Sequence, residues 1–338
     1  MTHEPLLRVN PIVKAKVFDS SQFSNYLSMH ALLKIDSELM KFIRTNKIHV
    51  KEFGGPATYG GSDTPFMRAV FKAYLKSSNE EKVILEAFIH EALSHFKSKK
   101  SLLYIGAKDG IHPAGLAPYF GHVEVMDKFG DGLLSERLEY NIRNNPAYQI
   151  PFDGAILSHS HYFEPTDNWV HLHKLVNSIM NPNAVVFSVI HRGKGQTEKL
   201  VNQFNGSADD TLRLGQFPSV IAQSLGNANA EITYVPTKVT VAGTDIHSMI
   251  HKVNFLLMDT GASVEQELQT TVHFLPAQVT ISGVKPSAML QKVGFLFLDS
   301  GAMVSEDVLK AHIEMKLKDA DGIYRISRYD EIYFYEVK

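Results

Sequence analysis

Residues 101–110 read Ser-Leu-Leu-Tyr-Ile-Gly-Ala-Lys-Asp-Gly, an apolar run that passes directly into a glycine-rich turn. Pro113 follows closely and suits the first turn of a helix. A strand, a glycine turn and a helix in this order let backbone amides at the helix N-terminus approach a ligand. The same pattern also occurs as a plain strand-to-helix connection, so the interpretation depends on what surrounds it.

Further apolar runs follow the first one and are separated by helical patterns: residues 122–126, 154–157 and 184–190. Strands that alternate with helices predict a parallel sheet with helices on both faces. The expected fold class is therefore α/β, with a doubly wound Rossmann-like sheet.

The strand predicted over residues 122–126 is followed by Asp127. An acid at the carboxyl end of this strand can accept hydrogen bonds from both hydroxyls of a ribose. Ligands of open α/β sheets bind outside the carboxyl ends of the strands, so residues after the later strands should face the ligand too. Those residues are Ser158-His159-Ser160-His161-Tyr162 and His191-Arg192-Gly193.

The chain before residue 101 is expected to be mainly helical. Residues 1–58 are interpreted as an N-terminal helical extension, with the clearest helix over residues 31–44. Thr64 and Pro65 can begin a helix that places Met67, Val70, Phe71 and Tyr74 on one face. Another helix is predicted to start at Ser78, with Glu81 completing a capping box, and to bury Leu85, Phe88, Ile89, Ala92 and Phe96.

The C-terminal third contains a duplication, because residues 235–268 repeat at 275–308, forty positions later. One duplication is too few copies for a solenoid. We interpret residues 235–320 as a duplicated strand-and-helix insertion that forms a substrate lid, after a ligand-binding domain over 59–234. Residues 321–338 supply the final sheet strand, and the β-rich run 323–337 suits a sheet-closing hairpin with alternate residues on one face.

Composition excludes several classes of protein. The 34 Lys and Arg against 36 Asp and Glu give a net charge of -2, so no basic field attracts nucleic acid. The absence of cysteine excludes disulfides, thiolate zinc sites and a cysteine nucleophile. With no leader pattern and no run of transmembrane length, we expect a cytoplasmic protein with no membrane partner.

On these residues the chain resembles histamine N-methyltransferase and its relatives among the class I S-adenosylmethionine-dependent methyltransferases, over about residues 59–258 and the last strand. Leu103-Tyr104-Ile105-Gly106 resembles the first strand and glycine turn of that family. Val125-Met126-Asp127 resembles its second strand and ribose-binding acid. Phe152-Asp153-Gly154 with Ser158-His159 resembles its fourth strand, and 185–189 with Gly193 its fifth.

The resemblance implies S-adenosylmethionine as cofactor and assigns roles to residues. Glu80 falls where the family places the carboxylate that receives the substrate amine, and Tyr162 and Phe71 match family aromatics. The predicted catalytic residues are His159, Tyr162 and Glu80. The predicted cofactor residues are Gly106, Ala107, Lys108, Asp109, Gly110, Asp127, Lys128 and Ser158, and the predicted substrate residues are Phe71, His161, His191 and Tyr59.

The chain departs from the family pattern in three places. Lys108 replaces a glycine of the usual turn, and the segment 144–150 is too short to carry the usual adenine-binding acid. Arg328 and Tyr329 stand where the family has asparagines that line the substrate pocket. Glu80 also has a simpler interpretation, as a first-turn carboxylate that the helix dipole favours.

The paired histidines raise the question of a metal. His159 and His161 would share one face of a strand end, while His171 and His173 are expected on the solvated face of the helix that contains Trp169. A His-x-His pair needs further ligands close by, so we predict no metal and expect His159 to face the substrate.

The leading hypothesis is an N-methyltransferase that acts on a small amine or imidazole. An O-methyltransferase for a small molecule, or a non-catalytic relative that keeps the fold for binding or assembly, are the alternatives. A nicotinamide-dependent dehydrogenase ranks below these, because the turn lacks a compact G-x-G-x-x-G pattern. The expected partner is a small-molecule methyl acceptor, and a homodimer is considered for the duplicated unit.

Overall fold

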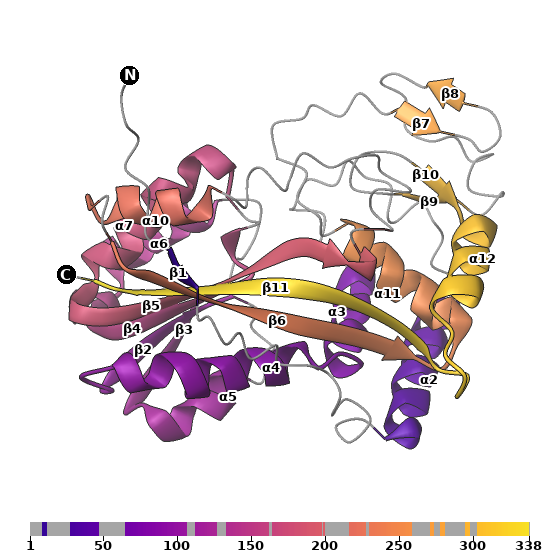
Figure 1. Ribbon diagram of the computed structural model, residues 1–338, viewed down its shortest axis with the longest axis horizontal. Coiled ribbons are helices and arrows are strands. Elements are labelled where there is room, and N and C mark those ends of the chain that lie inside the picture. The colour runs from indigo at the N-terminus through magenta and orange to yellow at the C-terminus, as the bar shows by residue number, and fades with distance from the viewer. Residues whose placement is uncertain are drawn as a thin grey trace.

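The computed structural model describes residues 9–11, 28–46, 65–106, 112–126, 133–161, 164–197, 199, 216–227, 230–258, 271–273, 278–280, 295–297 and 303–337. Seven strands form one sheet in the order β1-β6-β11-β5-β4-β2-β3 (Figure 1). In that order their bounds are Val9–Pro11, Ile232–Gly243, Tyr324–Glu336, Met180–Gly195, Phe152–Ser158, Ser101–Ile105 and His122–Met126.

The strands β3, β2, β4 and β5 run parallel. The chain forms β2, then β3 on one side of it, and then crosses to β4 and β5 on the other side. The point where the strand order reverses, between β2 and β4, is where open α/β sheets bind their ligands. The doubly wound Rossmann-like fold predicted from the sequence is confirmed.

The last strand, β11, lies between β5 and β6 and is antiparallel to both. It is one long strand in the interior of the sheet, so the expectation of a terminal hairpin is wrong. An antiparallel strand at this position also separates the sheet from the classic 3-2-1-4-5-6 order of dinucleotide-binding domains.

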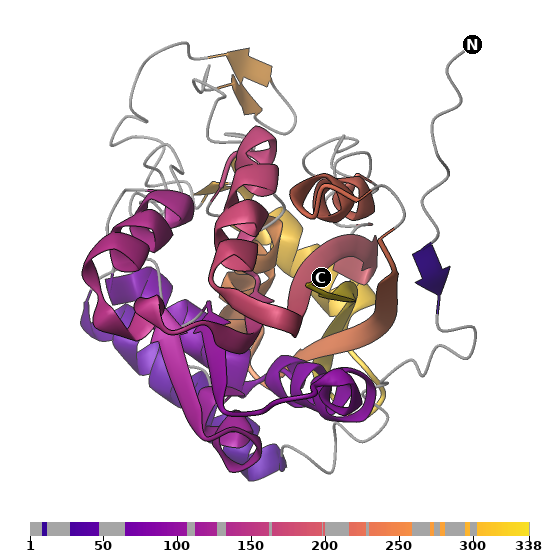
Figure 2. The same ribbon diagram turned by 90° about the vertical axis from the view of Figure 1, so that its left-hand side faces the viewer.

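Helices cover both faces of the sheet, as Figure 2 shows. One core joins Leu103 and Ile105 of β2 to α6 (Leu134–Asn144), α7 (Trp169–Ser178) and α10 (Phe217–Ser224). The other core joins Leu102 and Tyr104, which point the opposite way along the same strand, to α4 (Glu80–Ala87) and α5 (His112–Leu116). Alternation along β2 therefore builds two hydrophobic layers.

A third hydrophobic cluster lies at the carboxyl end of β6 and the amino end of β11. It joins the two strands to α3 (Pro65–Lys76), α11 (Ile246–Met258) and α12 (Glu306–Lys316) through Tyr74, Val241, Met249, Val253, Leu256, Leu309, Ile313 and Ile326. The N-terminal helix α2 (Met29–Thr45), which includes the predicted 31–44, packs on α3 and α11. The extension also supplies β1, the edge strand beside β6.

The predicted capping box at Ser78 is absent. The helix α4 begins at Glu80 with Asn79 as its N-cap residue, and no side chain caps it. Ser78 forms a bridge with Val241, and the Asn79 side chain accepts a hydrogen bond of 2.7 Å from the Thr240 amide. Pairing with β6 thus moves the helix start to Glu80, where the Ser78 hydroxyl accepts only a 3.4 Å hydrogen bond from the Glu80 amide. Beyond Ala87 the helix continues as a π-helix (Phe88–Ala92) and a 3-10 turn (Leu93–His95).

The first copy of the duplicated unit is part of the core. Its strand is β6, an inner strand of the sheet, and its helix is α11. The first copy therefore supplies an inner strand of the sheet and is not an insertion, while its role as a substrate lid stays a prediction. In the second copy, β9 (Phe295–Phe297) pairs with β10 (Met303–Ser305), and the residues equivalent to β9 in the first copy, 255–257, lie in α11. The strands β7 (Thr271–His273) and β8 (Gln278–Thr280) form a separate pair.

One copy of the unit should be dispensable to this core. Deleting residues 259–298 joins Met258, the end of α11, to Asp299-Ser300-Gly301-Ala302, which repeats the native continuation Asp259-Thr260-Gly261-Ala262. We expect the shortened chain to unfold cooperatively in urea, with a free energy of unfolding no lower than that of the full chain, because β6, α11, α12 and β11 all remain. Loss of the cooperative transition would show that the deleted copy belongs to the core.

Candidate active site

The carboxyl ends of β2 and β4 approach each other closely at Gly106 and Ser158. A Cβ atom on Gly106, whose φ is 153°, would lie 2.6 Å from the Ser158 carbonyl oxygen. Only glycine fits this contact, which explains the glycine directly after the first strand. Gly106 and Ser158 are thus brought together as predicted, whereas Ala107, Lys108, Asp109, Gly110, Asp127 and Lys128 lie outside the described residues.

His159 follows Ser158 in an uncommon backbone conformation, with φ of 50°. Its amide donates a hydrogen bond of 3.2 Å to the Val189 carbonyl of β5. A non-glycine residue in the left-handed region costs of order 1 kcal/mol and is often found where a side chain must be aimed at a ligand. The turn directs the His159 imidazole towards α4 and β11.

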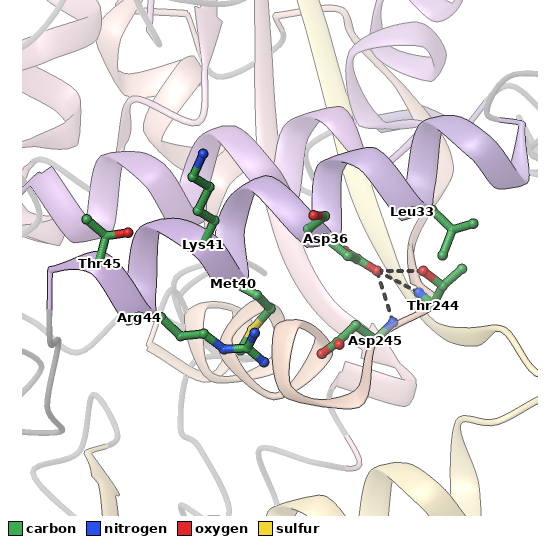
Figure 3. Close-up of a pocket in the computed structure, with 9 residues that line it drawn as sticks. Leu33, Asp36, Met40, Lys41, Arg44, Thr45, Thr244 and Asp245 are labelled. Carbon is green, nitrogen blue, oxygen red and sulfur yellow. Dashed lines mark hydrogen bonds between the residues drawn. The ribbon is translucent and has the colours of Figure 1, made fainter.

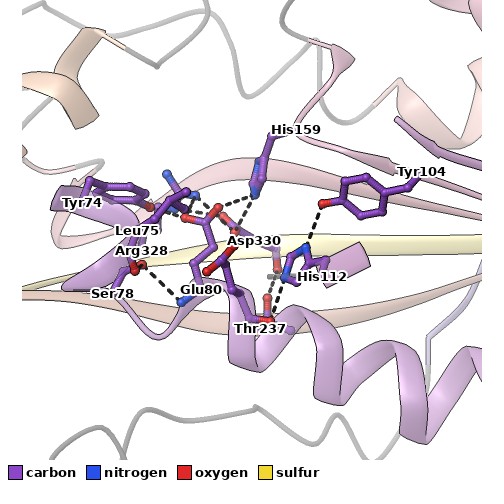
Figure 4. Close-up of polar contacts among 11 residues, drawn as sticks. Tyr74, Leu75, Ser78, Glu80, Tyr104, His112, His159, Thr237, Arg328 and Asp330 are labelled. Atoms are coloured by element: carbon purple, nitrogen blue, oxygen red, sulfur yellow. Dashed lines mark hydrogen bonds and ion pairs between the residues drawn. The ribbon is translucent and has the colours of Figure 1, made fainter. Parts of the chain in front are cut away.

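Five polar side chains from four elements meet there (Figure 4). The His159 Nε2 atom lies 3.0 Å from Glu80 Oε1 and 3.6 Å from Asp330 Oδ2. The Arg328 guanidinium lies 2.8 Å from Glu80 Oε2 and 3.2 Å from Asp330 Oδ1. The Tyr74 hydroxyl donates to Glu80 Oε2. We name Tyr74, Glu80, His159, Arg328 and Asp330 the carboxylate–imidazole cluster.

The cluster is almost completely shielded from solvent. Only the His159 side chain keeps appreciable exposure, at 18%, against 6% for Glu80, 2% for Arg328 and 0% for Asp330. Burying charges is tolerated where they are paired and hydrogen-bonded. Two carboxylates, one guanidinium and a protonated imidazole sum to zero, so the cluster is charge-balanced when His159 carries its proton.

The neighbours of His159 determine its protonation. Burial alone would lower the pKa of this imidazole, but the Glu80 and Asp330 carboxylates outweigh that effect and raise it above 6.5. Burial disfavours the Glu80 carboxylate, yet Arg328 and His159 more than offset this and lower its pKa. Burial raises the pKa of the Tyr74 hydroxyl. Glu80 is thus a carboxylate, and His159 is a base that holds its proton more firmly than a free imidazole.

Strand register brings Asp330 to this position. Ser158 pairs with Val189 on β5, and Asp330 of β11 pairs with His191, two residues further along. The β5–β11 register is irregular between Tyr329 and Asp330. Such irregularities often occur beside active sites, where they redirect side chains. The sheet therefore presents Arg328 and Asp330 at the same edge as His159.

A second buried histidine, His112, connects two helices and a strand near the cluster through hydrogen bonds. The His112 Nε2 atom donates a 2.8 Å hydrogen bond to the Glu81 carbonyl, which leaves Nδ1 to accept from the Tyr104 hydroxyl at 2.8 Å. Burial lowers the pKa of His112 to about 4. This imidazole is neutral and connects α5, α4 and β2.

We expect the buried histidine His112 to make the fold acid-sensitive. Its folded pKa of about 4 lies below the unfolded value of 6.5, so its contribution is complete above pH 6.5 and is lost as pH falls towards 4. The shift corresponds to about 3 kcal/mol. Urea unfolding across this range should show a smaller pH dependence in His112→Asn than in the wild type. His171→Asn, at an exposed position, is the matched control, and an equal slope in all three proteins would contradict the expectation.

His161 does not share the orientation of His159, so the prediction that both imidazoles lie on one face is wrong, and a substrate role for His161 has no support in these contacts. The strand β4 ends at Ser158, and the turn at His159 breaks the alternation on which the prediction depended. His161 Nε2 lies 2.9 Å from His173 Nε2, and His173 Nδ1 lies 2.9 Å from the Tyr335 hydroxyl. His173, expected in solvent, is fully buried, whereas His171 is exposed beside Glu139.

The structure places the remaining predicted residues as follows. Phe71 stacks on Tyr74 at a centroid distance of 6.4 Å, so it supports the cluster from behind the tyrosine. Tyr59, Tyr162 and the His191 side chain lie outside the described residues. Sequence reasoning missed Tyr74 and Asp330. A signal was available in β11, where Arg328 and Asp330 place two charges on the strand face that also carries Tyr324, Ile326, Ile332 and Phe334.

Glu80, His159 and Asp330 offer atoms within 4.8 Å of one another, a spacing that suits a metal ion. Both carboxylates, however, already contact the Arg328 guanidinium. A divalent cation beside this buried positive charge would meet strong repulsion. The arrangement therefore favours hydrogen bonding to an organic ligand over binding of a metal ion.

A surface cavity of about 430 Å³ lies elsewhere, between α2 and the start of α11 (Figure 3). Leu33, Met40, Lys41, Arg44 and Asp245 are among the residues that line it. Its polar floor is the Asp36 carboxylate, which is fully engaged by Thr244, Asp245, Ser248 and Lys252. Neither Gly106, Ser158 nor any member of the carboxylate–imidazole cluster lines this cavity. Among the described helices, none has the length and apolar character needed to cross a bilayer.

No protein-family model and no curated protein matches the chain. Similar solved structures include an S-adenosylmethionine-bound amino pentose methyltransferase from Micromonospora echinaspora, 16% identical over 32% of this chain and 49% of that one, with a TM-score of 0.23. An N-methyltransferase from Bradyrhizobium japonicum is 12% identical over 42% and 81%, with a TM-score of 0.28. An O-methyltransferase family protein from Burkholderia thailandensis is 11% identical over 59% and 67%, with a TM-score of 0.37.

The chain spans about half the length of the amino pentose methyltransferase that it matches. Similarity this low does not extend to substrate or residue roles. Any functional assignment therefore depends on the residues of this chain.

Proposed function

We propose that this chain is an S-adenosylmethionine-dependent methyltransferase that modifies a small molecule. One observation carries the proposal. His159, which directly follows β4 and lies beside the close approach of Gly106 and Ser158, pairs with the buried Glu80. This is the edge of the sheet where α/β domains bind ligands. A base held there by a carboxylate can take a proton from a nucleophile that attacks an adjacent methyl group.

The residues at the switch point fit a nucleoside cofactor. Gly106 lets the ends of β2 and β4 approach each other closely at the switch point, because a Cβ there would lie 2.6 Å from the Ser158 carbonyl oxygen. In the proposal Gly106 and Ser158 contact the cofactor, and Asp127 accepts hydrogen bonds from the ribose. S-adenosylmethionine supplies an electrophilic methyl group, and the protein needs only to align the acceptor and manage its proton.

Two kinds of acceptor suit the proposed activity. A small amine or imidazole, as in the resemblance to histamine N-methyltransferase, would place its nitrogen near Glu80. A hydroxyl acceptor would use His159 as general base. The non-catalytic alternative is less favoured, because a binding protein gains nothing evident from a left-handed His159 held against two carboxylates.

The proposal is tested by calorimetric titration with S-adenosylmethionine. We expect saturable binding, weakened by about 1–3 kcal/mol in Asp127→Ala through loss of the ribose hydrogen bonds. The exposed variant His171→Asn should bind like the wild type. Normal affinity in folded Asp127→Ala would reject the ribose role, and absence of binding to the wild type would reject the proposed cofactor.

A further inference from the structure

We infer that the acceptor presents a hydroxyl group to His159 rather than an ammonium group to Glu80, because the Arg328 guanidinium already fills the cationic position between the two carboxylates. The inference rests on the proposed methyl transfer and specifies its substrate class. It also changes the role of Glu80, from receiving the substrate to holding the base.

All four carboxylate oxygens in the cluster already face an internal cation or donor. Glu80 Oε1 faces His159, and Oε2 receives Arg328 at 2.8 Å and the Tyr74 hydroxyl. Asp330 Oδ1 faces Arg328 at 3.2 Å, and Oδ2 lies 3.6 Å from His159. An ammonium could reach either carboxylate only by displacing Arg328 or His159. Displacing Arg328 would leave a buried guanidinium without its counter-charge.

Exposure points to the same conclusion. His159 is the one member of the cluster with a side chain more than 10% exposed, at 18%, so a ligand arriving from solvent meets the edge of this ring first, with both ring nitrogens buried behind it. An imidazole can accept a proton from a hydroxyl, and as imidazolium it can donate to an oxygen. It offers no favourable contact to an ammonium once it is protonated.

The charge balance suits proton transfer to His159. The described charged and titratable groups around this imidazole are Glu80 from α4, Arg328 and Asp330 from β11, Tyr74 from α3, and the buried imidazoles of His112 and His161. With a neutral His159 the two carboxylates exceed the one guanidinium, and with imidazolium the cluster balances. The site is thus complementary to the state in which His159 has taken a proton.

The step balances without any further reactant. A lone pair of the acceptor oxygen forms the bond to the methyl carbon, and the electron pair of the breaking carbon–sulfur bond stays on sulfur. The hydroxyl proton moves to His159 Nδ1, because Nε2 faces Glu80 and Asp330. The products are a methyl ether or ester, S-adenosylhomocysteine and an imidazolium that releases its proton to water.

The first test identifies the atom that becomes methylated. Small molecules extracted from a lysate are incubated with the full-length protein and S-adenosylmethionine labelled with carbon-13 in the methyl group, and carbon NMR distinguishes methyl on oxygen from methyl on nitrogen. Labelled O-methyl product supports the inference. Labelled N-methyl product overturns it and leaves the methyltransferase proposal intact, whereas absence of any labelled product overturns both.

The second test changes the cluster itself. Arg328→Gln removes the internal cation, so N-methylation of amines should appear or rise at least tenfold relative to O-methylation. Asp330→Asn removes one carboxylate beside His159, so the NMR midpoint of this imidazole and the pH profile of methyl transfer should both move down by about one pH unit. An unchanged acceptor preference in folded Arg328→Gln, or unchanged midpoint and profile in Asp330→Asn, would overturn the inference.

Discussion

Replacing Lys252 by methionine is expected to lower the free energy of unfolding by about 3–5 kcal/mol, because it leaves a buried carboxylate without its counter-charge. The Lys252 side chain is fully buried and pairs with Asp36, which is 2% exposed. Asp36 also accepts hydrogen bonds from the Thr244 amide at 2.7 Å and the Ser248 hydroxyl at 2.8 Å. Burial raises the pKa of Asp36, but Lys252 and these donors more than offset it, so the carboxylate stays ionised.

The helix α2, which contains Asp36, also provides the control for this experiment. Lys34 and Glu38 form an exposed pair on α2 at 4.0 Å, with 76% and 58% of their side chains in solvent. Lys34→Met should leave the urea midpoint unchanged, because exposed pairs add little to stability. The double variant Asp36→Leu with Lys252→Met should recover much of the loss, since an apolar pair can replace a buried ion pair. Equal urea midpoints for Lys252→Met and the wild type would contradict the conclusion that the buried Asp36–Lys252 pair stabilises the packing of α2 on α11.

Replacing His159 by asparagine is expected to slow methyl transfer by about 10²–10⁴-fold while affinity for S-adenosylmethionine stays within twofold. The imidazole is the proposed base, whereas the proposed cofactor contacts are Gly106, directly after β2, and Ser158, the last residue of β4. Glu80→Gln should act in the same direction, because the carboxylate no longer holds the imidazolium. The measurement is kcat with the acceptor found by labelling, and His171→Asn is the control.

The direction in which the rate of methyl transfer changes with pH also follows from the role of His159 as base. The base must be unprotonated to act, and its carboxylate neighbours raise its pKa above 6.5, so methyl transfer in the wild type should increase as pH rises through a midpoint above 6.5. His159→Asn should lose this dependence along with its rate. A wild-type rate that falls as pH rises above neutrality would contradict the role of His159 as base.

Local patterns were sufficient to predict the four parallel strands β2, β3, β4 and β5. The runs 101–105 and 122–126 coincide with β2 and β3, because the first is mostly apolar and the second alternates polar with apolar residues. Gly106 and Ser158 were correctly placed at the strand ends, since period and polarity alone determine where a buried strand stops. Glu80 and His159 also meet, as the resemblance implied.

Long-range contacts explain what the sequence did not show. His173 is buried because His161 and Tyr335, the latter 162 residues away, complete its hydrogen bonds. Asp330 reaches His159 only because β11 inserts antiparallel beside β5. The duplicated segments show the same effect of context. Residues 255–257 lie in α11, whereas the equivalent 295–297 form β9, so similar sequences adopt different secondary structure at the two places.

The central claim, methyl transfer at the switch point with His159 as base, is tested most directly by a crystal structure with S-adenosylhomocysteine. The account predicts the nucleoside over Gly106 and Ser158, with the sulfur turned towards the His159 imidazole and space between them for a methyl group and an acceptor oxygen. A bound molecule whose sulfur points away from His159, or a switch point that stays empty at saturating concentration, would contradict the account.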